Sequence, residues 1–257
     1  MEQHTTICKN CGYTFTGNYC NNCGQAANLP ELSLHYVWHE IQHGIFHFDN
    51  GIFYTIKQLL TRPGHTAREF INGKRIHHFK PISLVVVLAT FYGLLFHFFI
   101  DHTSEVKLET TTDQVITLYE NLNRWLMGHF AYISLMLTLI ATVTSYYVFR
   151  KQGYNLVEHF ILNAFYASLV LVVTLLTFPL LYLFSGGEKE NLNNYLMITQ
   201  QVHFILMCWC YIQFFNKMPK LKTFGRTVLT YFIMLFGIAA IALISILIAS
   251  IISKAKI

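Results

Sequence analysis

Long apolar runs fill most of the chain after residue 80 and alternate with polar connections. Five of these runs contain no Asp, Glu, Lys or Arg, and each reaches the length of about 20 residues that a helix needs to cross the hydrocarbon core of a bilayer. They cover approximately Pro81–Ile100, Phe130–Phe149, Phe160–Phe184, Tyr195–Phe215 and Val228–Ile252. The pattern predicts an all-α integral membrane protein with about five transmembrane helices, in a domain of residues 81–257.

The segment before the first run, residues 28–80, has the spacing of amphipathic helices, and we call it the collar. Its apolar positions recur at helical spacing between Leu34 and Phe48, which predicts a first helix with one apolar face. Asp49 is a typical cap for a second helix over Gly51–Leu60, and a third is expected from about His65 to Asn72. We expect these to be cytoplasmic juxtamembrane helices lying at the membrane interface or against the bundle.

Composition and charge support this prediction and suggest an orientation. Hydrophobic residues make up 54% of the chain, charged residues 12%, and the mean hydropathy is +0.41, whereas about a quarter of a soluble domain is charged. Basic residues gather in the N-terminal region and in two connections, as Arg150, Lys151, Lys217, Lys220, Lys222 and Arg226. Because Lys and Arg remain in the cytoplasm, a cytoplasmic N-terminus and an external C-terminus are expected. Lys254 and Lys256 oppose this orientation, so an interfacial or re-entrant final segment is the alternative.

Four cysteines near the N-terminus have the spacing of a zinc ribbon over residues 1–27. They form two C-x-x-C pairs, each followed by glycine, at Cys8, Cys11, Cys20 and Cys23. Four thiolates close the coordination sphere of one zinc ion, so the site is predicted to be structural and not catalytic. Two disulfides or free thiols are the alternatives, and a reducing cytoplasm disfavours the disulfides. The ribbon has few basic residues, which argues against nucleic acid as its partner.

The first collar helix carries a ridge of evenly spaced histidines, His35, His39, His43 and His47. Within the ridge, His39, Glu40 and His43 match the H-E-x-x-H pattern, in which two helical histidines bind zinc and the glutamate acts on water. The sequence does not place a third ligand, for which His47, Asp49, Glu69 and the Glu158–His159 pair are candidates. A polar helix face is the main interpretation, and a second metal site or a metallopeptidase is the alternative.

The end of the collar contains the juxtamembrane functional candidates, namely Arg62, Pro63, Gly64, Arg68, Gly73, Lys74 and Arg75. The basic residues among them also have a simpler interpretation as topology signals and contacts with anionic headgroups.

These same residues carry a family resemblance. The stretch FHFDNGIFYTIKQLLTRPGHTAREFINGKRIHHFKPIS, between a CKNCG…YCNNCGQ ribbon and a tail of several spans, resembles a bacterial family of zinc-ribbon membrane proteins classed as a domain of unknown function. The resemblance covers roughly the first 90 residues and implies a shared architecture without an activity. The layout is more loosely similar to the Ypt-interacting-protein membrane superfamily with its five spans, which would imply membrane organisation or partner recruitment.

The leading hypothesis is a non-enzymatic protein of the bacterial inner (cytoplasmic) membrane, whose zinc ribbon docks a cytoplasmic protein or helps to organise the membrane. Membrane lipids are the other expected partners. A membrane transporter, or a metal-dependent membrane enzyme that uses the histidine ridge, is the alternative. His203 is the deepest ionisable residue in the predicted spans, and a lone histidine there is more often packed and hydrogen-bonded than part of an ion pathway.

Overall fold

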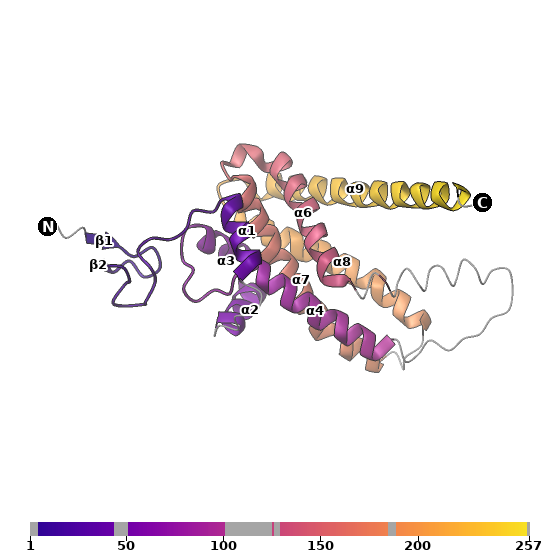
Figure 1. Ribbon diagram of the computed structural model, residues 1–257, viewed down its shortest axis with the longest axis horizontal. Helices are drawn as coiled ribbons and strands as arrows, with labels where there is room; N and C mark the ends of the chain where they lie inside the picture. The colour runs from indigo at the N-terminus through magenta and orange to yellow at the C-terminus, as the bar shows by residue number, and fades with distance from the viewer. Residues whose placement is uncertain (1–4, 44–50, 101–124, 126–128, 185–188, 256–257) are drawn as a thin grey trace.

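The computed structural model describes residues 5–43, 51–100, 125, 129–184 and 189–255, and most of them are helical. A two-stranded antiparallel sheet of β1 (Thr5–Ile7) and β2 (Thr14–Thr16) precedes the helices. The helices are α1 (Leu34–His43), α2 (Gly51–Thr61), α3 (Pro63–Ile71), α4 (Pro81–Ile100), α6 (Phe130–Phe149), the 3-10 turn η2 (Arg150–Gln152), α7 (Leu156–Phe184), α8 (Lys189–Phe214) and α9 (Lys220–Ala255). The sheet and the end of α9 lie at opposite ends of the molecule (Figure 1).

Helix α7 is the centre of the bundle. Helices α4 and α6 pack on it and on each other, and α8 also contacts it. Side chains along α7, such as Leu162, Phe165 and Leu169, are fully buried. In the most apolar stretch of α7, 67% of the residues are buried inside the protein, whereas the corresponding value for α9 is 17%. Helix α9 is therefore peripheral to the bundle, although its first turns pack on α6 and α8.

Three helices within the described residues are long and apolar enough to cross a membrane, over Phe130–Gln152, Leu156–Pro179 and Lys220–Ala240. This finding supports a membrane protein. The other two predicted spans are helical, but within the residues described in full their apolar parts, Pro81–Leu95 and Gln201–Phe214, are shorter. The count of five spans therefore stays a prediction.

Two of the long helices have the predicted bounds, and three extend further because of polar ends that the apolar runs do not include. Helix α7 begins before Phe160 because Asn155 and Glu158 form a reciprocal cap. The backbone N–H of Glu158 donates to Asn155 Oδ1 over 2.9 Å, and that of Asn155 donates to Glu158 Oε2 over 2.8 Å. Helix α9 begins directly after Pro219, whose carbonyl accepts from the N–H of Thr223.

Helix α3 packs on protein instead of presenting its apolar face to a bilayer. It contacts both α7 and α8, and its buried residues are Pro63, Gly64, Thr66, Ala67 and Phe70. A Cβ atom at Gly64 would collide with the carbonyl oxygen of Cys210 and the backbone nitrogen of Phe214. The absence of a side chain at Gly64 thus allows the backbones of α3 and α8 to touch.

We expect Gly64→Ala to destabilise the protein by about 1–3 kcal/mol or more, because the methyl group must displace the backbone of α8. Thermal unfolding in mild detergent measures the change. Gly225→Ala in α9 is the matched control, since a Cβ there meets no atom within 4 Å and alanine favours a helix. A Gly64→Ala protein as stable as the wild type would contradict the close contact.

Candidate metal centre

The ribbon is built from two turns with the same backbone geometry. In each turn the N–H of the first cysteine donates to a carbonyl five residues on, and its own carbonyl accepts from a glycine N–H. These bonds join Cys8 with Tyr13 and Gly12 over 2.9 Å, and Cys20 with Gln25 and Gly24 over 2.8 Å. Both glycines have a positive φ, 75° and 77°, which glycine adopts without strain.

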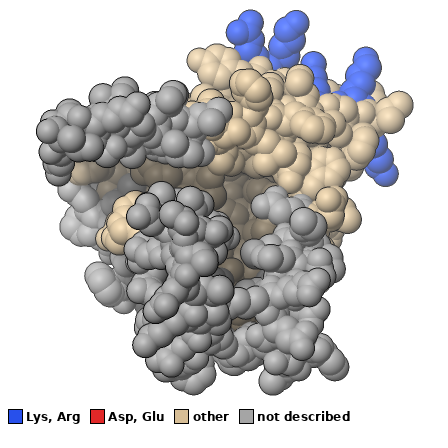
Figure 2. All heavy atoms as spheres, turned by 90° about the vertical axis from the view of Figure 1, so that its right-hand side faces the viewer, with Lys and Arg blue, Asp and Glu red and all other residues tan. Residues whose placement is uncertain are grey.

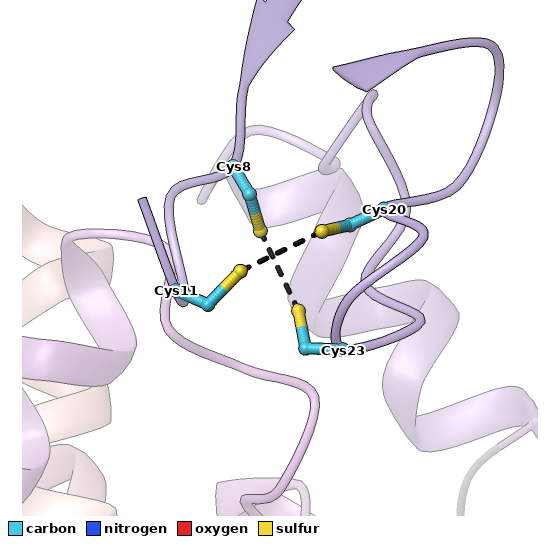
Figure 3. Close-up of side chains that lie close together, drawn as sticks. All are labelled: Cys8, Cys11, Cys20 and Cys23. Carbon is cyan, nitrogen blue, oxygen red and sulfur yellow. Dashed lines mark hydrogen bonds between the residues drawn. The ribbon is translucent and has the colours of Figure 1, made fainter. Parts of the chain in front are cut away.

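The turns bring the four sulfur atoms to one point (Figure 3). All four Sγ atoms lie within 4.8 Å of one another, with 3.6 Å between Cys8 and Cys23 and 3.5 Å between Cys11 and Cys20. Tetrahedral zinc with Zn–S bonds of about 2.3 Å would separate sulfurs by about 3.8 Å. The predicted ligand set is therefore confirmed as a cluster that can hold a metal ion, consistent with zinc.

The polar surroundings of the thiols favour the thiolate form at one cysteine. The Asn22 side chain and the backbone of Tyr13 lower the pKa of the Cys11 thiol to about 6. Burial raises the pKa of the Cys20 thiol, and a bound cation offsets this cost by binding the thiolate. Metal binding should therefore release protons and weaken as the pH falls.

The ribbon contacts the collar of its own chain through Gln25, which is 2% exposed. The side-chain oxygen of Gln25 accepts from the backbone N–H groups of Arg75 and Ile76 over 3.1 and 3.3 Å. A Cβ at Gly73 would lie 2.8 Å from Cδ of Lys9, so the Lys9 side chain of the ribbon packs closely on the collar loop. Gln25 was not among the predicted site residues, because a contact between positions 50 residues apart leaves no local pattern.

The loop that receives Gln25 is shaped by the end of α3. Gly73 adopts φ +101°, and the N–H groups of Gly73 and Lys74 donate to the carbonyls of Phe70 and Glu69 over 3.1 and 2.9 Å. These two backbone hydrogen bonds, together with the positive φ of Gly73, close the C-terminal end of α3. The Arg75 guanidinium lies 5.3 Å from the ring centroid of Phe70, and its Nη1 donates to the carbonyl of Pro30 over 2.8 Å.

The other basic candidates stabilise α3 and its contact with α8. Arg68 Nη1 donates to the last carbonyls of α8, Gln213 over 2.7 Å and Phe214 over 3.0 Å. A cation at this end of a helix is favourable because the carbonyls there are unpaired and carry partial negative charge. Glu69 forms ion pairs with Arg62 at 3.2 Å and Lys74 at 3.5 Å. Among these candidates, Gly64 and Arg68 thus hold the collar on the bundle, whereas Arg62 and Lys74 form ion pairs within the collar.

His78 connects three helices of the collar and the bundle. Its ring lies 5.2 Å from Tyr54 in α2, 6.3 Å from Phe70 in α3 and 6.3 Å from Phe165 in α7, measured between centroids. Burial lowers the pKa of His78 to about 4. The imidazole is therefore neutral at pH 7 and packs as an aromatic ring.

A second polar cluster, fully buried in the bundle, was not predicted as a unit. Ser145 of α6 lies 3.1 Å from His159 Nδ1 of α7 and accepts from Asn163 Nδ2 over 3.0 Å. The hydroxyl of Tyr211 in α8 donates to Asn163 Oδ1 over 2.7 Å. His159 is thus hydrogen-bonded inside the bundle and Glu158 caps α7, and their proposed role as a third ligand of the histidine ridge stays a prediction.

Most of the histidine ridge lies outside what the structure describes. His35 is exposed at the start of α1, whereas the side chains of His39, Glu40 and His43 and the whole of His47 and Asp49 fall outside the described part. Among the residues searched, the four cysteines are the group of three or more His, Cys, Asp and Glu side chains that can hold a metal. The second metal site and the H-E-x-x-H hypothesis stay predictions.

Over the part of the chain that the structure describes, fold and site together define a helical protein with three candidate membrane-spanning helices and a cysteine cluster able to bind metal. A family model described as protein of unknown function (DUF3667) matches residues 49–93. This region contains α2, α3, the loop that binds Gln25 and the first part of α4. No curated protein and no solved structure matches the chain, so the likeness to the Ypt-interacting-protein superfamily stays an analogy of layout.

We expect the purified wild-type protein to contain one zinc ion per chain and the Cys8→Ser, Cys20→Ser double variant to contain none, because two thiolates cannot replace four. Metal analysis by mass spectrometry measures this. Cys208→Ser is the control, since Cys208 lies in α8 away from the cluster. Loss of metal should also speed amide exchange at Arg75 and Ile76, and a metal content unaffected by the double variant would refute the site.

We expect His78 to make stability depend on pH. Its pKa of about 4 in the folded protein lies below the ordinary value of about 6.5, so the unfolded chain binds a proton first as the pH falls. The stabilisation is complete above about pH 6.5 and decreases by about 3 kcal/mol as the pH falls to about 4. The free energy of unfolding of His78→Phe should not decrease in this way between pH 6.5 and about 4, whereas that of the control His77→Phe, which changes an exposed histidine, should decrease as in the wild type.

Proposed function

We propose that the protein is a non-enzymatic multi-pass protein of the bacterial inner membrane, whose zinc ribbon presents a docking surface for a cytoplasmic protein. The proposal rests on the fact that the ribbon has two different sides. Gln25 and Lys9 contact the collar, whereas Ile7, Tyr13 and Tyr19 are 69%, 50% and 65% exposed. Tyrosines on a surface held in a fixed orientation are typical of protein interfaces.

Five spans with the ribbon in the cytoplasm are part of this proposal. Helices α4 and α8 have 20 and 26 residues, which is sufficient length for a span. The long helices alternate in direction, so the ribbon lies at one end of the bundle and the end of α9 at the other. Exposed basic residues border the ribbon end, as Lys80, Arg150, Lys151, Lys217, Lys220 and Lys222, in agreement with the side on which Lys and Arg are retained.

A Tyr13→Ser, Tyr19→Ser double variant tests the docking surface. We expect a protein that co-purifies with the wild type from solubilised membranes to be lost from this variant, with the zinc content unchanged. Thr14→Ala with Thr16→Ala, at exposed positions of β2, is the matched control and should retain the partner. Equal co-purification with all three proteins would refute docking through these tyrosines.

Transport through the bundle is the second candidate, favoured by the buried cluster of Ser145, His159, Asn163 and Tyr211. His159 Nε2 is buried without a hydrogen-bond partner among the described residues, and polar groups inside a membrane bundle often mark a pathway. His203, the deepest histidine in the predicted spans, lies 3.4 Å from Thr174 Oγ1 and so fits a packed, hydrogen-bonded residue. Solute flux into liposomes that disappears in His159→Leu would favour transport over docking.

A further inference from the structure

Two turns at the ribbon end of the bundle are brought together by stacked side chains. Phe149, the last residue of α6, stacks on Phe215 just after α8, with centroids 4.0 Å apart and planes at 5°. The guanidinium carbon of Arg226 in α9 lies 6.0 Å from the centroid of the Phe149 ring. The three side chains therefore place the turn after α6 beside the first turns of α9.

Both turns are basic and contain no acid. Residues 149–152 and 215–226 include no Asp or Glu, and we call their cations the basic rim, namely Arg150, Lys151, Lys217, Lys220, Lys222 and Arg226. The first five are exposed, and the ion pairs found among the described residues involve Glu69 with Arg62 and Lys74 instead. In the view of Figure 2, Lys and Arg side chains project along one edge, and the described surface in that view shows no acidic side chain.

Arg226 provides an independent sign that a ligand completes the rim. Its Nη1 is buried and has no hydrogen-bond partner among the residues that the structure describes. A guanidinium remains charged in proteins, and a buried charged N–H group without an acceptor is costly. An anionic oxygen placed in the rim would supply the missing countercharge.

The neighbouring side chains indicate that this anion belongs to a lipid. Leu221 is 82% exposed and Phe224 is 42% exposed, and both lie between the cations of α9. The candidate span Lys220–Ala240 begins within the rim, which puts the cations at the level of headgroups and the apolar side chains beside acyl chains. A soluble phosphate or a nucleic acid would gain nothing from these exposed apolar groups.

We propose that the basic rim is a binding site for the phosphate headgroup of anionic membrane lipids. The inference rests on the membrane location proposed above and adds a defined lipid site to it. Lipid phosphates would lie between the turn after α6 and the first turns of α9, with Arg226 at the base and Arg150 and Lys222 at the sides.

The test uses the full-length protein in mild detergent and compares retention of phosphatidylglycerol and phosphatidylcholine by native mass spectrometry and by titration in mixed micelles. We expect phosphatidylglycerol to bind preferentially, and its affinity to fall about twenty-fivefold in Arg150→Gln with Lys222→Gln, because each surface cation contributes about a factor of five. Lys57→Gln removes a charge from an exposed position of α2 in the collar and should change the affinity less than twofold. Arg226→Gln should also weaken binding. If Arg226→Gln does not fold, the variant Arg150→Gln with Lys222→Gln, which changes exposed residues only, still tests the proposal.

Three outcomes would overturn the proposal: equal retention of both lipids, equal loss in the rim and collar variants, or glycerol phosphate in solution binding with the same dependence on the rim. The last outcome would assign the rim to a soluble anion. Carbonate extraction of native membranes tests the membrane location separately. A wild-type protein that stays in the membrane pellet but lacks lipid selectivity would refute the lipid site alone, whereas its release from membranes would refute the proposed location.

Discussion

The contact between α3 and the end of α8 is the constraint on which the arrangement of the collar depends. Gly64 brings the two backbones together, its N–H donates to Gln213 Oε1 over 3.1 Å, and Arg68 binds the last carbonyls of α8. A helix of nine residues is too short to be stable by itself. Its stability comes from this packing and from the guanidinium that completes the partner helix. The ribbon, in turn, is positioned by the loop at the other end of α3.

The long helices were predictable because an apolar run of sufficient length has few alternatives to a helix. Helices α4 and α6 have the predicted bounds, since Pro81 begins α4 and the polar turn η2 directly follows α6. The apolar runs predicted for α7 and α9 begin later than the helices themselves. Asn155 and Glu158 cap the start of α7 and Lys220 begins α9, and hydropathy does not indicate any of these polar residues. The apolar pattern alone left two environments open for α3, since an amphipathic face looks the same whether lipid or protein covers it, and the structure places α3 against α7 and α8.

The candidate site was predictable where chemistry fixes the spacing. Two C-x-x-C turns define the four sulfur positions locally, and the structure places them together. The amides that connect the ribbon, the collar and the bundle were missed. Gln25 binds residues 50 and 51 positions away, and Gln213 binds a residue 149 positions away. A neutral side chain with a distant partner has no periodicity, charge or spacing that marks it, whereas Gly64, Gly73 and Arg75 were predicted as candidates because they carry the family resemblance.

The way in which Gln25 binds the collar also has a consequence for sequence change. Its single oxygen accepts from two consecutive backbone N–H groups, so the ribbon recognises the shape of the loop and not the identity of the side chain at Ile76, which is 42% exposed. Substitutions at that position can therefore accumulate without altering the contact. A change that reshapes the backbone at Gly73, in contrast, would alter both partners at once, so the two parts of the chain are free to diverge in sequence but not in conformation.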